Sequence, residues 1–143
     1  MELIYPYSGK RPVIIASIEN AVTSTRCFFQ MLLDTGAERT CFPAKYAAAL
    51  GCSNRQAGVH SHTLHGLGGS SKCYVHRVQV GLIDPIKSAP GKVVVVWKSK
   101  LDRAFFAEKL DCGFGLLGMD LMAEWKSVTF NRQPNAGQIK ILL

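Results

Sequence analysis

Short apolar runs rich in β-branched residues recur along the chain, and polar or glycine-containing turns separate them. Residues 11–18 place Val and Ile behind a proline and predict a strand, and residues 27–33 predict a second strand that ends at a polar turn. Residues 93–97, four valines and a tryptophan, have the composition of a buried strand. We therefore expect an all-β protein.

Two hairpins are predicted from neighbouring strand segments. Residues 63–65 and 73–80 flank a tip rich in glycine and serine, which is typical of a long β-hairpin with a flexible end. Near the end of the chain, residues 127–130 and 138–143 flank a turn at 134–137. That pattern predicts a final hairpin.

Short helices are expected between the strands. Residues 44–51 begin behind Pro43, consist mostly of good helix formers and stop at Gly51, so about two helical turns are predicted. Residues 119–126 also have helical composition. Residues 102–110 fit either a short helix or a loop that covers one sheet edge, and the sequence leaves both open.

Size and composition limit the organisation of the chain. Its 143 residues, 48% of them hydrophobic, suffice for a single domain over residues 1–143. No apolar run approaches the roughly 18 residues of a membrane helix, and the first residues lack a secretory signal, so we expect a soluble chain without a membrane segment. Five cysteines without a CxxC pair favour reduced thiols. The expected location is the cytoplasm, with a place in a larger precursor as the alternative.

Asp34 lies in the segment that points most clearly to chemistry. Two apolar residues, Leu32 and Leu33, deliver its carboxylate into a turn made by Thr35 and Gly36. An aspartic peptidase presents its catalytic acid in this way. Because that chemistry needs two carboxylates facing one water, and the motif occurs once, the sequence predicts an obligate homodimer.

Three segments in this order resemble the retropepsin-like aspartic proteases, and more closely the single-lobe cellular and bacterial members than the retroviral ones. They are the Leu-Leu-Asp-Thr-Gly-Ala turn at 32–37, the Gly-Leu-Gly-Gly tip at 66–69 and the apolar run at 115–122. The resemblance implies the closed β-barrel of one acid-protease lobe, with one short C-terminal helix and a β-hairpin flap. It also implies an aspartic endopeptidase that cleaves a peptide or protein substrate without a metal or other cofactor.

The resemblance further assigns roles to individual residues. Asp34 of each subunit contributes to a catalytic dyad that holds one proton, so that one carboxylate acts as base toward water and the other as acid. Thr35 bonds across the dimer, and the N–H of Gly36 bonds the carboxylate. The implied substrate-binding residues are Ala37, Gly66, Leu67, Gly68 and Gly69. The four residues of the hairpin tip would form a flap over an extended peptide, with Leu67 as its apolar end.

Two features depart from the retroviral pattern. Met119 stands where those enzymes have an arginine, which leaves Glu38 without that partner. The stretch 84–111 is longer than in the compact viral enzymes, and we expect it to form an added strand and a cover that contacts substrate or regulates access. The viral form of dimer support is therefore not expected.

The net charge of +7 is concentrated in one stretch. No acid lies between Glu38 and Asp84, whereas Lys, Arg and all four histidines occur there. For an aspartic protease, this distribution predicts a preference for substrates with Asp or Glu flanking the cut. Nucleic acid is not an expected partner, because the stretch lacks the interleaved aromatic side chains of stacking platforms.

The alternative to catalysis by Asp34 is a catalytically silent module that keeps the peptide-binding groove and docks partners. A metal site is a separate question, raised by His60, His62 and His65, which with Cys52 or Cys73 carry the atoms that bind zinc. Their spacing matches no closed zinc pattern, so no metal site is predicted.

Overall fold

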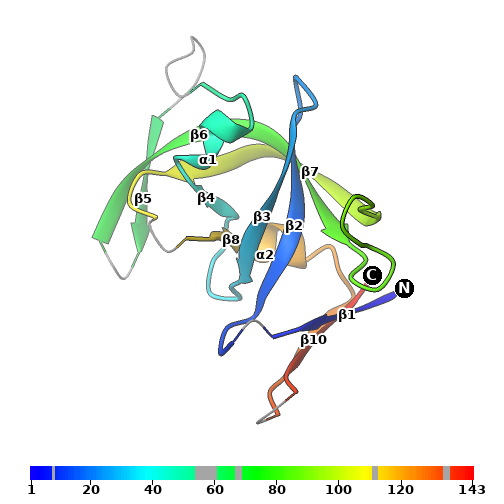
Figure 1. The fold of residues 1–143 in the computed structure, drawn as a ribbon. Helices are drawn as coiled ribbons and strands as arrows, with labels where there is room; N and C mark the ends of the chain where they lie inside the picture. Colours follow the sequence, from blue (N-terminus) through cyan, green and yellow to red (C-terminus); the bar gives the residue numbers. More distant parts are fainter. Residues whose placement is uncertain (8, 54–60, 67–68, 111–112, 134–135) are drawn as a thin grey trace.

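The computed structural model describes residues 1–7, 9–53, 61–66, 69–110, 113–133 and 136–143, and of residues 61, 62, 64–66 and 69 the backbone alone. Most of this part of the chain forms strands (Figure 1). The strands are β1 (Glu2–Pro6), β2 (Val13–Asn20), β3 (Arg26–Leu33), β4 (Cys41–Pro43), β5 (Ser61–Gly66), β6 (Gly69–Ile83), β7 (Val95–Ala107), β8 (Gly115–Leu117), β9 (Ser127–Asn131) and β10 (Gln138–Leu142). The helices are α1 (Tyr46–Ala49) and α2 (Met119–Met122).

Six strands close into a barrel in the order β2-β3-β8-β4-β7-β6. The ring closes because β2 pairs on one side with β3 and on the other with β6, where Ile18 lies opposite Val80. β3 runs parallel to β8, and β4 runs parallel to β7. β5 extends from the ring as the second arm of a hairpin with β6 (Figure 1). The predicted closed all-β barrel with a projecting hairpin is confirmed.

A second, three-stranded sheet has the order β1-β10-β9 and joins the two ends of the chain. The N–H of Leu143 donates to the carbonyl of Met1 at 2.9 Å, so the termini lie side by side (Figure 1). Tyr5 ties this sheet to the barrel, because its buried hydroxyl donates to the carbonyl of Ile83 at 2.6 Å. The final predicted hairpin is the β9 and β10 pair, and β1 is a strand that the sequence pattern did not indicate.

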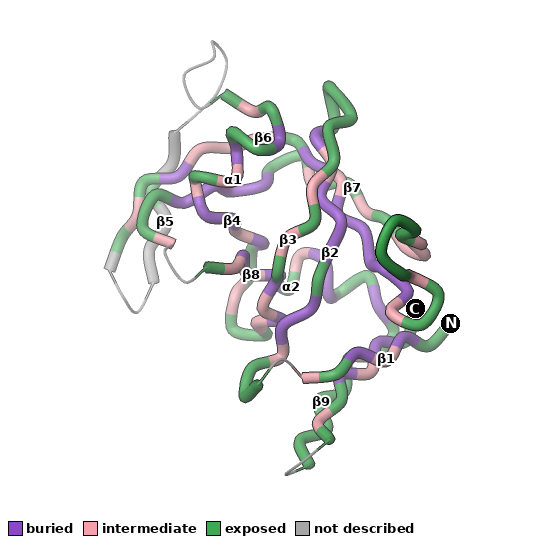
Figure 2. Tube along the Cα trace, in the orientation of Figure 1, coloured by how far each residue is buried: buried purple, intermediate pink, exposed green. Residues whose placement is uncertain are grey.

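Apolar side chains fill the barrel and continue beneath the second sheet. The buried stretches in Figure 2 follow β2 and the second half of β6, residues 78–83. Phe42 and Phe106 stack with ring centroids 5.0 Å apart in the middle of the core, and neither is exposed to solvent. Ile139 and Ile141 of β10 belong to the same buried cluster. One continuous core therefore fixes the strands that carry the candidate site.

Three predictions of local structure were wrong. Residues 93–97 are not a buried strand, because β7 begins at Val95, Val93 is 43% exposed and residues 94–97 are half-buried. The segment 44–51 holds a single helical turn, α1, instead of about two, and the chain leaves it through Gly51 at φ +70°. The segment 102–110 is neither a helix nor a loop along most of its length, because β7 runs unbroken to Ala107. The segment is a strand despite its mixture of charged and apolar residues, because its backbone pairs with β6 on one side and, near Phe105, with β4 on the other.

Candidate active site

Asp34 follows the last residue of β3, between two neighbouring segments that hold the backbone. Its N–H donates to the carbonyl of Leu117 in β8 at 3.1 Å, and the N–H of Leu33 donates to the carbonyl of Pro12 at 2.9 Å. The strand that carries Asp34 is therefore fixed from both sides up to the point where the turn begins. Such support limits the positions that the carboxylate can adopt.

The turn after Asp34 holds one oxygen of the carboxylate. The N–H of Gly36 donates to Asp34 Oδ1 at 2.9 Å, and the N–H of Ala37 donates to the carbonyl of Asp34 at 3.2 Å. A Cβ on Gly36 would lie 3.3 Å from Oδ1, a tight contact that a small shift of the carboxylate relieves. Asp34 is half-buried, whereas Thr35 and Gly36 are exposed. The predicted bond from Gly36 is present.

The segment that begins at Gly118 supports the far side of the turn. The N–H of Met119 donates to the carbonyl of Ala37 at 2.8 Å, and the N–H of Asp120 donates to the carbonyl of Glu38 at 3.1 Å. A Cβ on Gly118 would lie 2.6 Å from the carbonyl carbon of Arg39, so only glycine allows this approach without moving backbone. Backbone contacts from 118–120 therefore hold the far side of the turn.

Thr40 and Asp120 form a partly buried contact that the sequence analysis missed. The N–H and the Oγ1 of Thr40 donate to Asp120 Oδ2 and Oδ1 at 2.9 and 2.6 Å, and the N–H of Gly118 donates to Thr40 Oγ1 at 3.0 Å. Thr40 has no solvent exposure. The sequence signals this contact only by spacing. Thr40 lies six residues after Asp34, and Asp120 lies two residues after Gly118.

Gly66 and Gly69 lie opposite each other at the end of the β5 and β6 hairpin. Leu67 and Gly68, the predicted apolar end of the flap and its neighbour, lie outside the described residues. The hairpin arises from β6, whose stem pairs with β7. Of the predicted site residues, the structure therefore brings Asp34 to Ala37 together in one turn and places Gly66 and Gly69 together on the hairpin.

The basic stretch is not free of acids in space, although it is in sequence. Glu108, next to β7, accepts a hydrogen bond from the hydroxyl of Tyr74 at 2.7 Å, and its N–H donates to the carbonyl of Lys72 at 3.0 Å. An acid from a distant segment thus lies against the stem of the hairpin. Glu108 therefore offsets part of the positive charge at this position, and the preference for acidic substrates stays a prediction.

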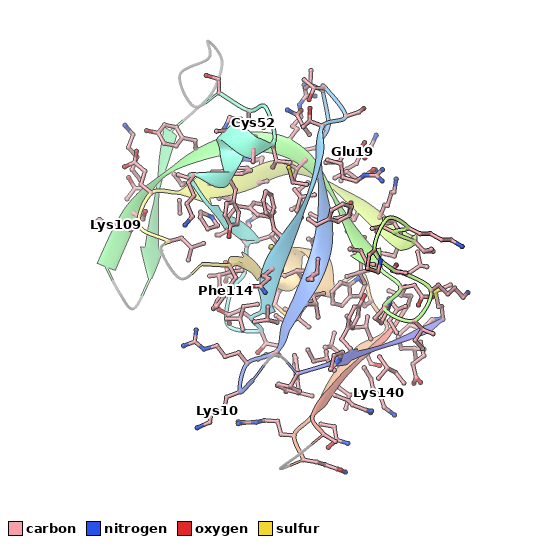
Figure 3. The ribbon with its side chains drawn as sticks, viewed as in Figure 1. Lys10, Glu19, Cys52, Lys109, Phe114 and Lys140 are labelled. Atoms are coloured by element: carbon pink, nitrogen blue, oxygen red, sulfur yellow. The ribbon has the colours of Figure 1, made fainter. Side chains whose placement is uncertain are left out.

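Arg11 adds a cation beside the Asp34 strand. It precedes Pro12, which binds the backbone of Leu33, and its guanidinium carbon lies 5.5 Å from the ring centroid of Phe114, labelled in Figure 3. Arg11 is exposed, and Phe114 directly precedes β8. A basic and an aromatic side chain therefore meet next to the two strands that hold the turn.

The thiol of Cys41, near the site, is not activated. Burial, with smaller contributions from the thiol of Cys73 and the carboxylate of Asp120, raises the pKa of Cys41 to about 12. A thiol with a raised pKa carries little thiolate at neutral pH and is a poor nucleophile. Among the described residues no group of His, Cys, Asp and Glu could hold a metal ion, and the side chains of His60, His62 and His65 lie outside the described part of the chain.

The barrel and the Asp34 turn together have the architecture of a single acid-protease lobe. Among solved structures, the chain is similar to a retropepsin-like aspartic protease from Rickettsia conorii, with 18% identity and a TM-score of 0.57 over 98% of this chain and 91% of that one. It is also similar to EIAV protease in complex with the inhibitor HBY-793, with 20% identity and a TM-score of 0.50 over 82% of this chain and 91% of that one. These similarities show a retropepsin-like fold.

Other comparisons found no relative. No family model matches the sequence, and no curated protein matches it. No helix in the described part of the chain has both the length and the apolar character to cross a membrane.

Proposed function

We propose that this chain is an aspartic endopeptidase that acts as a homodimer, with Asp34 of each subunit in one catalytic dyad. The observation that carries the proposal is how the two oxygens of the Asp34 carboxylate are hydrogen-bonded. Its Oδ1 accepts the N–H of Gly36, whereas its Oδ2 accepts no hydrogen bond from the described residues. One oxygen is held and the other is available to a water molecule or to a second carboxylate.

In this proposal a second copy supplies the second carboxylate, because the Asp-Thr-Gly motif occurs once in the sequence. Asp120 lies next to the turn, but both of its oxygens accept hydrogen bonds from Thr40. Asp120 therefore acts as a structural acceptor for Thr40. The second acid of the dyad is proposed to be Asp34 of another subunit.

The two Asp34 carboxylates would divide the work of hydrolysis. Two carboxylates at close range share one proton, because repulsion prevents both from being ionised. The ionised Asp34 removes a proton from a bridging water as the oxygen attacks the peptide carbonyl carbon. The protonated Asp34 of the other subunit donates to the carbonyl oxygen. Proton transfer to the departing nitrogen then breaks the C–N bond, and no covalent intermediate with the enzyme forms.

The hairpin of β5 and β6 is proposed to cover the substrate. It projects from the barrel and ends in glycines, which permit the backbone movement that a lid needs (Figure 1). An extended peptide between the hairpin and the barrel would gain affinity from main-chain hydrogen bonds. Gly66, Gly69 and Ala37 are proposed as contacts for that peptide.

The direct test compares Asp34→Asn with the wild type on a mixed peptide library. We expect cleavage to fall at least about a hundredfold, because the amide cannot act as a base. Asp102→Asn is the matched control, since Asp102 is an exposed acid on β7 far from the turn in sequence. Unchanged cleavage by the Asp34 variant would remove this residue from the mechanism.

A mixing experiment tests the shared site separately. Excess Asp34→Asn protein is added to a fixed amount of wild type and the subunits are allowed to exchange. A dyad built from two subunits predicts that activity falls as mixed dimers replace active ones, whereas a site complete in one chain predicts no loss. Peptide binding by a wild type that cleaves nothing would favour the alternative function, a silent docking module.

A further inference from the structure

The stem of the hairpin formed by β5 and β6 is fixed to the chain that follows β7. The hydroxyl of Tyr74 in β6 donates to Glu108 Oε1 at 2.7 Å, and the N–H of Glu108 donates to the carbonyl of Lys72 at 3.0 Å. One residue further on, the N–H of Lys109 donates to Ser71 Oγ at 3.0 Å. Lys109 is labelled beside the hairpin in Figure 3. We call these three hydrogen bonds the stem clamp.

Apolar packing holds the same part of the hairpin on its other face. Cys73 pairs with Ala107 and is completely buried, in a small cluster that also contains Phe105. Leu110, from the chain that follows β7, packs against this cluster. Because side chains alternate along a strand, Cys73 and Tyr74 point to opposite faces of β6. The stem is therefore held by the Tyr74 hydroxyl on one face and by apolar contact on the other.

The stem clamp lies where the pairing of β6 changes. From Cys73 onward β6 pairs with β7, whereas the strand partners of its residues Gly69 to Lys72 belong to β5. In the sheet order of the described residues, β5 has β6 as its one neighbour. The hairpin beyond the clamp is thus a two-stranded ribbon, which is marginally stable by itself. The clamp marks the boundary between this ribbon and the barrel.

We propose that Tyr74 and Glu108 are positioning residues for the hairpin lid. By fixing the stem to the chain after β7, they confine movement to the part of the hairpin beyond Ser71. A peptide that enters then has to order only this outer part, which costs less conformational entropy than ordering the whole β5 and β6 pair. This role rests on the proposed function of the hairpin as a lid. It gives the end of the 84–111 stretch the control of access that the sequence predicted as one of its roles.

Amide hydrogen exchange measures the stem clamp without using catalysis. The N–H groups of Glu108 and Lys109 both donate within the clamp, so their protection, measured by NMR, reports how often it opens. We expect Tyr74→Phe to reduce this protection about threefold to tenfold, because it removes a hydrogen bond to a carboxylate. Tyr7→Phe is the matched control, since Tyr7 follows β1 and its N–H donates to the carbonyl of Gly137. Its protection at the clamp should equal that of the wild type.

A double-mutant cycle shows whether Tyr74 and Glu108 act through their shared hydrogen bond. Glu108→Ala should reduce protection of the Lys109 amide as much as Tyr74→Phe does, after correction for intrinsic exchange rates. The double variant should add little, because both changes remove the same hydrogen bond. Glu108→Gln keeps an acceptor oxygen and should restore most of the protection. Urea unfolding checks that each variant stays folded.

Kinetics with a library peptide that the wild type cleaves connect the clamp to the substrate. Tyr74→Phe should raise KM about threefold to tenfold and change kcat by less than about twofold, because the lid affects binding and leaves the two acids unchanged. A general loss of folded protein would lower kcat instead.

Three results overturn the proposal: wild-type protection of both amides in Tyr74→Phe, full additivity of Tyr74→Phe and Glu108→Ala, or an unchanged KM in variants whose amides exchange faster. A wild type that cleaves no peptide would count against the proposed function. The exchange data would then decide by themselves whether Tyr74 and Glu108 position the hairpin.

Discussion

Replacing Thr40 by Val should destabilise the protein even though the two side chains have nearly the same shape. The change removes the Oγ1 that donates to Asp120 at 2.6 Å and accepts the N–H of Gly118 at 3.0 Å. A hydrogen bond to a carboxylate contributes about 1.5–3 kcal/mol, and a buried N–H left without a partner costs about 1–3 kcal/mol. Because the two losses share one atom and one loop, we expect a total of about 2–4 kcal/mol.

Urea unfolding followed by fluorescence measures this loss as a lower midpoint with an unchanged slope. Thr40→Ser is the informative companion, since it keeps the hydroxyl and loses only a methyl group, which costs about 1 kcal/mol. Thr129→Val on the exposed β9 controls for the chemistry of the substitution and should change stability by less than about 0.5 kcal/mol. The reasoning fails if Thr40→Val stays within about 0.5 kcal/mol of wild type, or if Thr40→Ser is equally damaging.

Two further predictions concern other parts of the structure. Gly118→Ala should cost about 1–3 kcal/mol in urea unfolding and reduce any peptidase activity, because the new methyl meets the backbone of Arg39 at 2.6 Å. Gly115→Ala should cost less, since its nearest contacts are the end of a flexible methionine side chain, and an equal loss would contradict this. Hydrogen bonding from the N–H of Lys87 lowers the pKa of Asp84 in the folded state, so its stabilising effect is present above about pH 4 and disappears as the pH falls further. The stability difference between wild type and Asp84→Asn should therefore shrink in acid titration, and a difference independent of pH would refute the assignment.

Local sequence patterns were sufficient to predict the elements that are stabilised by residues close together in the sequence. The strands around Ile14 and Met31 were predicted within two residues of their ends, because β-branched and apolar residues are concentrated there. The turn at Asp34 was predicted because its hydrogen bond from Gly36 closes within three residues. The hairpin that ends at Gly66 and Gly69 was found for the same reason.

The remaining elements depend on partners that are distant in sequence. β1 is only five residues long, and it forms a strand by pairing with β10 at the other end of the chain. β7 carries charges along a length that resembles a solvated face, but two neighbouring strands bind its backbone. The sheet pairing therefore overrode the local composition.

The sequence by itself determined two things about this protein. It contains one Asp-Thr-Gly turn at the end of an apolar strand, and its short apolar segments separated by turns predict a β-barrel. Only the tertiary structure decided how that turn is held, because Thr40 and Asp120 are 80 residues apart and meet only when β8 packs beside β3 and β4. The same holds for the stem clamp, because Tyr74 and Glu108 are 34 residues apart in the sequence. Residue type and short spacing are encoded locally, whereas contacts between distant segments exist only after the barrel has closed and buried its core.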